Sequence, residues 1–264
     1  RTLGQIIASL SRADIGDENA PAGGAAQASP FDLAQAPELQ SGVVVRKALP
    51  PPDCLDLSLP AGHICLLTDD GTPLTAELAR ALSAQGWRAA VLRFPPEVTG
   101  GLQPLPQGIE SVEMDDLSEA ALEACLREAA ERFGPPAVFI HLAPQGQGLR
   151  PAGALDFGER DKTLLKLVFL AAKHLKARLT RAAEQGWAAF MAVTRLDGGF
   201  GLGDGPDYSP ILGGLPGLVK TLNLEWDAVF CRAVDLSPQL ETSIAAECIL
   251  AELHDPNRLI SEVG

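Results

Sequence analysis

Short apolar runs alternate with amphipathic segments along most of this chain. The run at 62–68 predicts a buried strand, and leucines spaced four residues apart at 74–82 predict a helix behind it. Gly86 ends that helix, and a second apolar run at 87–93 predicts another strand. The three segments together form one βαβ unit, the usual opening of a nucleotide-binding α/β domain.

The same alternation continues to the last residue. Strands are predicted at 42–47, 62–68, 87–93, 109–114, 137–142, 187–193, 229–236 and 258–263, and helices at 74–85, 119–133, 164–179, 212–226 and 240–253. Strands that alternate with helices through short connections indicate an α/β fold. We therefore predict a doubly wound, mostly parallel Rossmann-like sheet with helices on both faces.

The first 41 residues differ in composition from the rest. Residues 1–10 have the apolar spacing of a short amphipathic helix. Residues 11–41 are rich in alanine, glycine, proline and serine, and they carry five acidic residues against the single base Arg12. Burial of the few apolar residues in this segment would not offset the conformational entropy lost on ordering it. We therefore predict an acidic flexible linker at 11–41 and a folded domain at 42–264.

Composition narrows the classes of function. With 264 residues and 46% hydrophobic content, the chain can bury a substantial core, and it has neither an apolar run of membrane-spanning length nor a signal peptide. The net charge of -13 argues against nucleic acid as a partner. Five scattered cysteines are typical of core thiols in a reducing cytoplasm, and four widely separated histidines do not suggest a metal site.

The turn after the first strand of the βαβ unit lacks the chemistry of a dinucleotide-binding turn. Such a turn uses glycines, so that backbone N–H groups at a helix N-terminus approach the diphosphate. Here the turn reads Thr68, Asp69, Asp70 and Gly71, and Pro73 removes one donor. Each carboxylate would repel a phosphate charge by about 1 kcal/mol in water, so no cofactor is predicted in this turn.

Three further features carry possible chemistry. Arg93 ends the second strand, where related folds bind an adenosine 2′-phosphate, but a surface arginine is the preferred interpretation. The loop Gly198–Gly205 could cradle a phosphate, although a mobile surface loop is preferred because no helix begins at its last glycine. His141 ends a strand and is interpreted as a satisfied core residue rather than the remnant of a site.

The segment Tyr208–Leu222, with Cys231–Leu236 after it, resembles the late part of the short-chain dehydrogenase/reductases. In that family a catalytic tyrosine is followed four residues later by a lysine. On this pattern Tyr208 takes the place of the tyrosine, but the lysine position is Leu212, and the family's serine falls near Thr194. A phenol with a pKa of about 10 is a poor acid–base group without that ammonium, so Tyr208 is predicted to be vestigial.

A fold signal kept without the active residues resembles the structural subdomain of a polyketide-synthase ketoreductase. More narrowly, residues 213–226 and 249–260 resemble the ketoreductase region of polyunsaturated-fatty-acid synthases, and residues 1–10 resemble the last helix of an acyl-carrier domain. The resemblance implies a structural, non-catalytic subdomain that braces a following catalytic ketoreductase subdomain in the same polypeptide. NADPH, phosphopantetheine and the acyl-carrier domains would then belong to the parent synthase. The alternative is a divergent but active NAD(P)H-dependent reductase that uses Tyr208 and Lys220, and a regulatory module of the same fold is a third reading.

Overall fold

The structure is a computed structural model that describes residues 44–144, 158–203, 209–255 and 257–264. The chain divides into two compact units, residues 1–47 and residues 48–264. The predicted helix at 1–10 and the predicted linker at 11–41 lie outside the described residues. Residues 44–47 form no strand, so the prediction of a strand at 42–47 is wrong over the part that is described.

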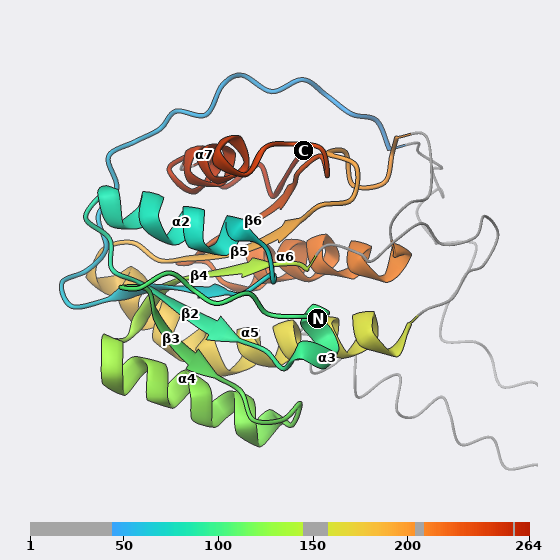
Figure 1. Cartoon of the computed structure of the whole chain (residues 1–264). Coiled ribbons are helices and arrows are strands. Elements are labelled where there is room, and N and C mark those ends of the chain that lie inside the picture. The colour runs from blue at the N-terminus through green and yellow to red at the C-terminus, as the bar shows by residue number, and fades with distance from the viewer. Residues whose placement is uncertain (1–43, 145–157, 204–208, 256) are drawn as a thin grey trace, which may run out of the picture. The chain divides into compact units, whose positions relative to one another are not determined.

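The second unit is built on a sheet of seven strands in the order β3-β2-β1-β4-β5-β6-β7 (Figure 1). Every strand pairs in parallel with its neighbours. The strands are β1 Ile64–Thr68, β2 Ala89–Arg93, β3 Glu110–Glu113, β4 Pro136–Leu142, β5 Ala189–Thr194, β6 Phe230–Asp235 and β7 Glu262–Val263. The predicted doubly wound parallel sheet is therefore confirmed, although β7 is shorter than the run at 258–263 suggested.

Helices cover both faces of this sheet (Figure 1). Helices α2 and α7 pack on one face, and α4, α5 and α6 pack on the other. The helices are α2 Pro73–Ala84, α3 Pro96–Thr99, α4 Glu119–Phe133, α5 Glu159–Gln185, α6 Gly214–Glu225 and α7 Thr242–Leu253, with a 3₁₀ turn at Pro210–Gly213. The single-turn helix α3 was not predicted, because the loop prediction at Pro95–Pro96 rested on proline content.

Local signals explain where the helices begin. Thr72 caps α2, and its hydroxyl accepts a hydrogen bond from the backbone N–H of Leu74. Pro73 occupies the first turn, where its missing N–H costs little. Ser118 caps α4 in the same way by accepting from the N–H of Ala121, which confirms the predicted helix start.

The sheet is buried on both faces, and this burial explains the continuous apolar runs in the sequence. Along β1, Ile64 and Leu66 enter one apolar layer, while Cys65 and Leu67 enter the other. Each fully buried leucine contributes about 1.5 to 3 kcal/mol. Most buried polar side chains lie where strands end at their carboxyl edge, among them Asp69, His141 and Asp235, and Arg232 is an exception within β6.

Candidate functional site at the carboxyl edge of the sheet

The carboxyl edge of the sheet is where an open α/β fold binds its ligand. Strand β1 lies between β2 and β4, so the chain reverses its direction of winding at this position. The end of β1 and the turn that follows therefore occupy the place where a dinucleotide would be held. The residues of this turn, predicted from sequence to have lost that chemistry, all lie within the described structure.

Asp70 is the hydrogen-bond acceptor at the centre of the turn. Its carboxylate accepts from the backbone N–H of Thr72 at 3.0 Å, from the Thr72 hydroxyl at 2.6 Å and from the Thr75 hydroxyl at 2.8 Å. Burial raises the pKa of Asp70, while the hydrogen bonds from Thr72 and Thr75 act in the opposite direction. The carboxylate thus occupies donors at the start of α2 that an exogenous anion would use.

Asp69 has the same role one residue earlier. One oxygen accepts from the backbone N–H of Gly71 at 2.9 Å, and the other accepts from Nε of Arg93 at 2.9 Å. Gly71 has a φ of 75°, and a Cβ there would clash with the carbonyl oxygen of Gly101, so glycine is required by its close approach to the next loop. The turn is closed by contacts within the chain.

Arg93 is not the solvated surface residue that the sequence suggested. Its side chain is only 12% exposed, and it is surrounded by acceptors. Nε donates to Asp69, Nη1 donates to Glu113 at 2.9 Å, and Nη2 donates to the carbonyl of Gln103 at 2.7 Å. A buried carboxylate needs a counter-charge, and that need, invisible in local sequence, explains why the surface interpretation was wrong.

A small cavity borders this turn. Its volume is about 150 Å³, and Asp69, Pro73, Glu77 and Gln103 lie among its lining residues. Cofactor and drug-sized ligand sites usually measure about 300 to 1,000 Å³. A dinucleotide is therefore larger than this cavity, whose charged lining residues are Asp69, Glu77 and Arg80.

A second cluster of donors lies at the carboxyl ends of β5 and β6. The Asp235 carboxylate is buried and accepts from the Thr194 hydroxyl at 2.7 Å and from backbone N–H groups of the loop after β5. These include the N–H groups of Leu196 at 2.8 Å, Gly199 at 2.9 Å and Phe200 at 2.9 Å. Sequence reasoning missed Asp235, whose signal was an acidic residue at the end of a mostly apolar strand.

The glycine-rich loop binds a second internal carboxylate. Asp197 accepts from the backbone N–H groups of Gly199, Gly201 and Gly203 at 2.7 to 2.8 Å. Burial raises the pKa of Asp197, but these backbone N–H groups together outweigh burial and bring it below its usual value. In the described part of the loop, residues 198–203, the amides that could have cradled a phosphate therefore bind carboxylates of this chain.

His141 lies beneath the turn in the buried layer. Its Nδ1 is 2.9 Å from the Thr68 hydroxyl, which also accepts from the backbone N–H of Leu142 at 2.9 Å. Nε2 of His141 has no hydrogen-bond partner among the described residues, so the core location is confirmed but full satisfaction of the ring is not. Burial lowers the pKa of His141 from 6.5 to about 3.

This depressed pKa predicts a loss of stability in mild acid. The unfolded imidazole takes up a proton near pH 6.5 and the folded one only near pH 3, so the stabilisation is complete above pH 6.5 and falls as the pH decreases toward 3. Between pH of about 7.5 and about 5 the wild-type chain should lose about 2 kcal/mol more unfolding free energy than His141→Asn. Urea unfolding at both pH values measures this.

Met191→Leu is the matched control, since residue 191 pairs with Ile140 on the neighbouring strand and brings no titrating group. It should keep the wild-type pH dependence. Equal losses for wild type and His141→Asn would show that His141 does not bind protons differentially on unfolding.

The structure describes only some of the residues matched to the reductase catalytic pattern. Tyr208 lies outside the described residues. Leu212 is buried in the 3₁₀ turn before α6, and the Thr194 hydroxyl is bonded to Asp235. Lys220 on α6 pairs with Glu262 of β7, with Nζ 3.2 Å from the carboxylate.

Two further observations concern the described residues alone. They contain no group of three or more histidine, cysteine, aspartate or glutamate side chains placed to hold a metal ion. None of their helices combines the length and apolar character needed to cross a membrane.

Solved structures define the class of fold. The apo form of LigO from Sphingobium sp. strain SYK-6 matches 80% of this chain and 83% of its own length, with a TM-score of 0.58 and 14% identity. A double variant of a short-chain dehydrogenase/reductase from Serratia marcescens matches 76% of this chain and 94% of its own, with a TM-score of 0.54 and 15% identity. The fold is that of the short-chain dehydrogenase/reductases.

The sequence comparison is more specific. No family model matches the chain. Over 223 residues it is 34% identical to a polyunsaturated fatty acid synthase polypeptide of Thraustochytrium sp., a match that covers 81% of this chain and 7% of that protein. The resemblance inferred from residues 213–226 and 249–260 is therefore confirmed: the chain is similar to a reductase-like segment of a large multidomain synthase and spans a small part of its length.

Proposed function

We propose that this chain is the non-catalytic structural subdomain of the ketoreductase region of a multidomain polyunsaturated-fatty-acid or polyketide synthase. It would brace the catalytic subdomain that reduces a β-ketoacyl thioester. One observation carries the proposal. The backbone donors at the nucleotide-binding edge are hydrogen-bonded to the carboxylates of Asp69, Asp70, Asp197 and Asp235.

Binding a dinucleotide here would require several costly changes. The diphosphate would have to displace Asp69 and Asp70 from the N–H groups of Gly71 and Thr72. It would also have to draw Arg93 away from Asp69, leaving a buried carboxylate unpaired, and breaking a buried pair in this way costs about 3 to 5 kcal/mol. The residues of this chain do not fit the cofactor, so we derive no reduction step through them.

The cofactors and partners follow from the same proposal. NADPH would bind the following catalytic subdomain, and phosphopantetheine on acyl-carrier domains would deliver the acyl chain. The predicted reducing cytoplasm is supported by the cysteines, because Cys65, Cys125 and Cys231 are buried as free thiols. Burial raises the pKa of Cys231 to about 12, which favours an unreactive core thiol.

The bracing role predicts a gain of activity and stability in the parent polypeptide. Residues 48–264 joined to the roughly two hundred residues that follow should give a reductase more stable and more active than those following residues alone. Thermal unfolding and NADPH oxidation with a β-ketoacyl thioester measure the two effects. Equal stability and equal activity with and without this unit would rule the bracing role out.

A second experiment distinguishes this proposal from the alternative of a divergent active reductase. NADPH and NADH titrated onto the isolated chain should give no saturable change in tryptophan fluorescence up to about 1 mM. Micromolar binding, followed by turnover that is lost in Tyr208→Phe, would instead favour catalysis by this chain. The ion pair between Lys220 and Glu262 supports the non-catalytic proposal, since it engages the lysine that the alternative requires.

A further inference from the structure

The edge of the sheet at β7 carries an exposed apolar surface. Leu224, in the last turn of α6, is 82% exposed, and Leu259, in the segment between α7 and β7, is 95% exposed. Among the large apolar side chains of the described residues, these two are the most exposed. The side-chain amide of Asn223 donates to the carbonyl of Arg258 at 3.2 Å, so the residues next to the two leucines are in contact. We call Leu224, Leu259 and strand β7 together the β7 surface.

The outer side of β7 belongs to the same surface. Strand β7 is the last in the sheet order, and β6 is its neighbour on one side among the described strands. Lys220, one helical turn before Leu224 on α6, pairs with Glu262 of β7 at 3.2 Å. The exposed face of α6 is therefore joined to the edge strand. An uncovered strand edge is a ready site for contact with another polypeptide.

Two arginines hold the segment between α7 and β7 in place. Arg232 is fully buried, and its guanidinium donates to the carbonyls of Asn257 at 2.7 Å and Ile260 at 3.3 Å. Arg258 donates to the carbonyl of Val229 at 2.9 Å. Hydrogen bonds from a charged donor are stronger than those between neutral groups. Leu259 is therefore presented to solvent by a fixed segment, not by a loop with few contacts.

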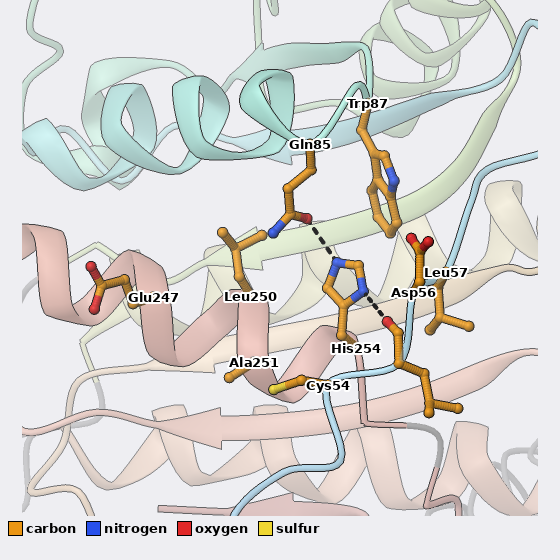
Figure 2. Close-up of a pocket in the computed structure, with 10 residues that line it drawn as sticks. Cys54, Asp56, Leu57, Gln85, Trp87, Glu247, Leu250, Ala251 and His254 are labelled. Atoms are coloured by element: carbon orange, nitrogen blue, oxygen red, sulfur yellow. Dashed lines mark hydrogen bonds between the residues drawn. The ribbon is translucent and has the colours of Figure 1, made fainter.

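The start of this segment is fixed as well. His254 caps the end of α7, and its ring lies between the segment 54–57 and the end of α2 (Figure 2). Nδ1 of His254 lies 2.8 Å from the carbonyl of Leu55, and Nε2 lies 2.8 Å from Oε1 of Gln85. The N–H of Leu55 donates to the carbonyl of His254 at 3.0 Å. Helix α7 thus ends at a defined point, from which the chain runs to Leu259 and β7.

We propose that the β7 surface packs against the catalytic subdomain of the same polypeptide. This inference rests on the proposed function, in which that subdomain follows this chain and is therefore joined to it next to β7. In the synthase relative, the matched segment is 7% of the length, so most of that polypeptide lies outside it. A short connection gives a joined domain an effective concentration in the millimolar range, which favours it over a second copy of this chain. Leucines that are already held in place need little ordering when they are covered.

Hydrogen–deuterium exchange tests the proposal on the full chain joined to the roughly two hundred residues that follow it. Residues 257–263 should exchange at least about tenfold more slowly in the joined polypeptide than in this chain alone, because the β7 surface becomes covered. Leu224→Glu combined with Leu259→Glu should abolish this difference, since two carboxylates would be buried without partners. The double variant should also remove most of the thermal stability and reductase activity that this chain adds.

Ile244→Glu is the matched control. Ile244 is 44% exposed and lies in the first turn of α7, on the opposite face of the sheet from α6. This variant should keep the slow exchange of residues 257–263 in the joined polypeptide. In the chain alone, the double variant and the control should unfold within about 2 °C of the wild type, because the replaced side chains are exposed.

The failure of this inference can be distinguished from the failure of the proposed function. Equal stability and activity with and without this chain would overturn both. A gain from the wild-type chain that the double variant retains in full, or that Ile244→Glu loses equally, would overturn the inference alone. Equal exchange of residues 257–263 in the two wild-type proteins would also overturn it. If the chain alone then forms a dimer that the double variant dissociates, the β7 surface belongs to a second copy.

Discussion

Replacing Arg93 with methionine should lower the free energy of unfolding by about 3 to 5 kcal/mol. The guanidinium is the counter-charge of Asp69, whose side chain is only 3% exposed, and methionine leaves that carboxylate buried without a cation. Arg93 also joins Glu113 and the Gln103 carbonyl to the turn, so its loss releases three contacts. Chemical denaturation at neutral pH measures the change, with one shared slope of unfolding free energy against denaturant concentration for both proteins.

Arg132→Met is the matched control for that substitution. Arg132 pairs with Glu128, but both side chains are about half exposed, at 50% and 48%. Its replacement should cost less than about 1 kcal/mol. The double variant Asp69→Asn with Arg93→Met should recover part of the lost stability, because it also removes the buried negative charge that Arg93→Met leaves without a partner. A loss below about 1 kcal/mol for Arg93→Met would contradict the counter-charge role.

The second large effect is expected at Asp235. Asp235→Ala removes the acceptor for the N–H groups of Leu196 and Phe200, and each buried donor left without a partner costs about 1 to 3 kcal/mol. We therefore expect a loss of at least about 3 kcal/mol in unfolding free energy. The amides of Leu196 and Phe200 should also exchange with deuterium faster, because the loop is released from β6.

Two variants make the result specific to the Asp235 carboxylate. Asp235→Asn retains one accepting oxygen and should lose less stability than the alanine variant. Asp227→Ala removes an exposed carboxylate near the end of α6 and should change stability by less than about 0.5 kcal/mol. Unchanged exchange at Leu196 and Phe200 in Asp235→Ala would show that the carboxylate does not hold the loop.

Both predictions rest on one physical idea. Backbone N–H groups at the carboxyl edge of a Rossmann-like sheet need hydrogen-bond acceptors, and the phosphates of a dinucleotide supply them in an active enzyme. In this chain Asp69 and Asp70 supply it after β1, and Asp197 and Asp235 supply it after β5. A site completed by its own carboxylates would keep the geometry of the fold without a ligand, as the proposed structural subdomain requires.

The hydrophobic pattern by itself determined the fold. A strand buried on both faces is a continuous apolar run in the sequence, and a helix packed on one face has apolar residues with a period of 3.6. Both patterns can be recognised within a short stretch of sequence. The identities at 68–71 predict a turn without the glycines of a dinucleotide site, and the structure places the carboxylates of Asp69 and Asp70 on backbone N–H groups of this turn. The composition-based predictions at 42–47 and 95–96 were wrong in the described residues, because residues 44–47 form no strand and Pro96 begins a short helix.

Only the tertiary structure decided which side chains meet. Arg93 lies 24 residues from Asp69, Asp235 lies 36 residues from Gly199, and His254 lies 199 residues from Leu55. No local period encodes these contacts, because they arise when parallel strands bring their ends to the same edge and when a distant segment crosses a helix. The sequence therefore identified a nucleotide-binding fold with an altered turn, and the three-dimensional packing showed which carboxylates now occupy its donors.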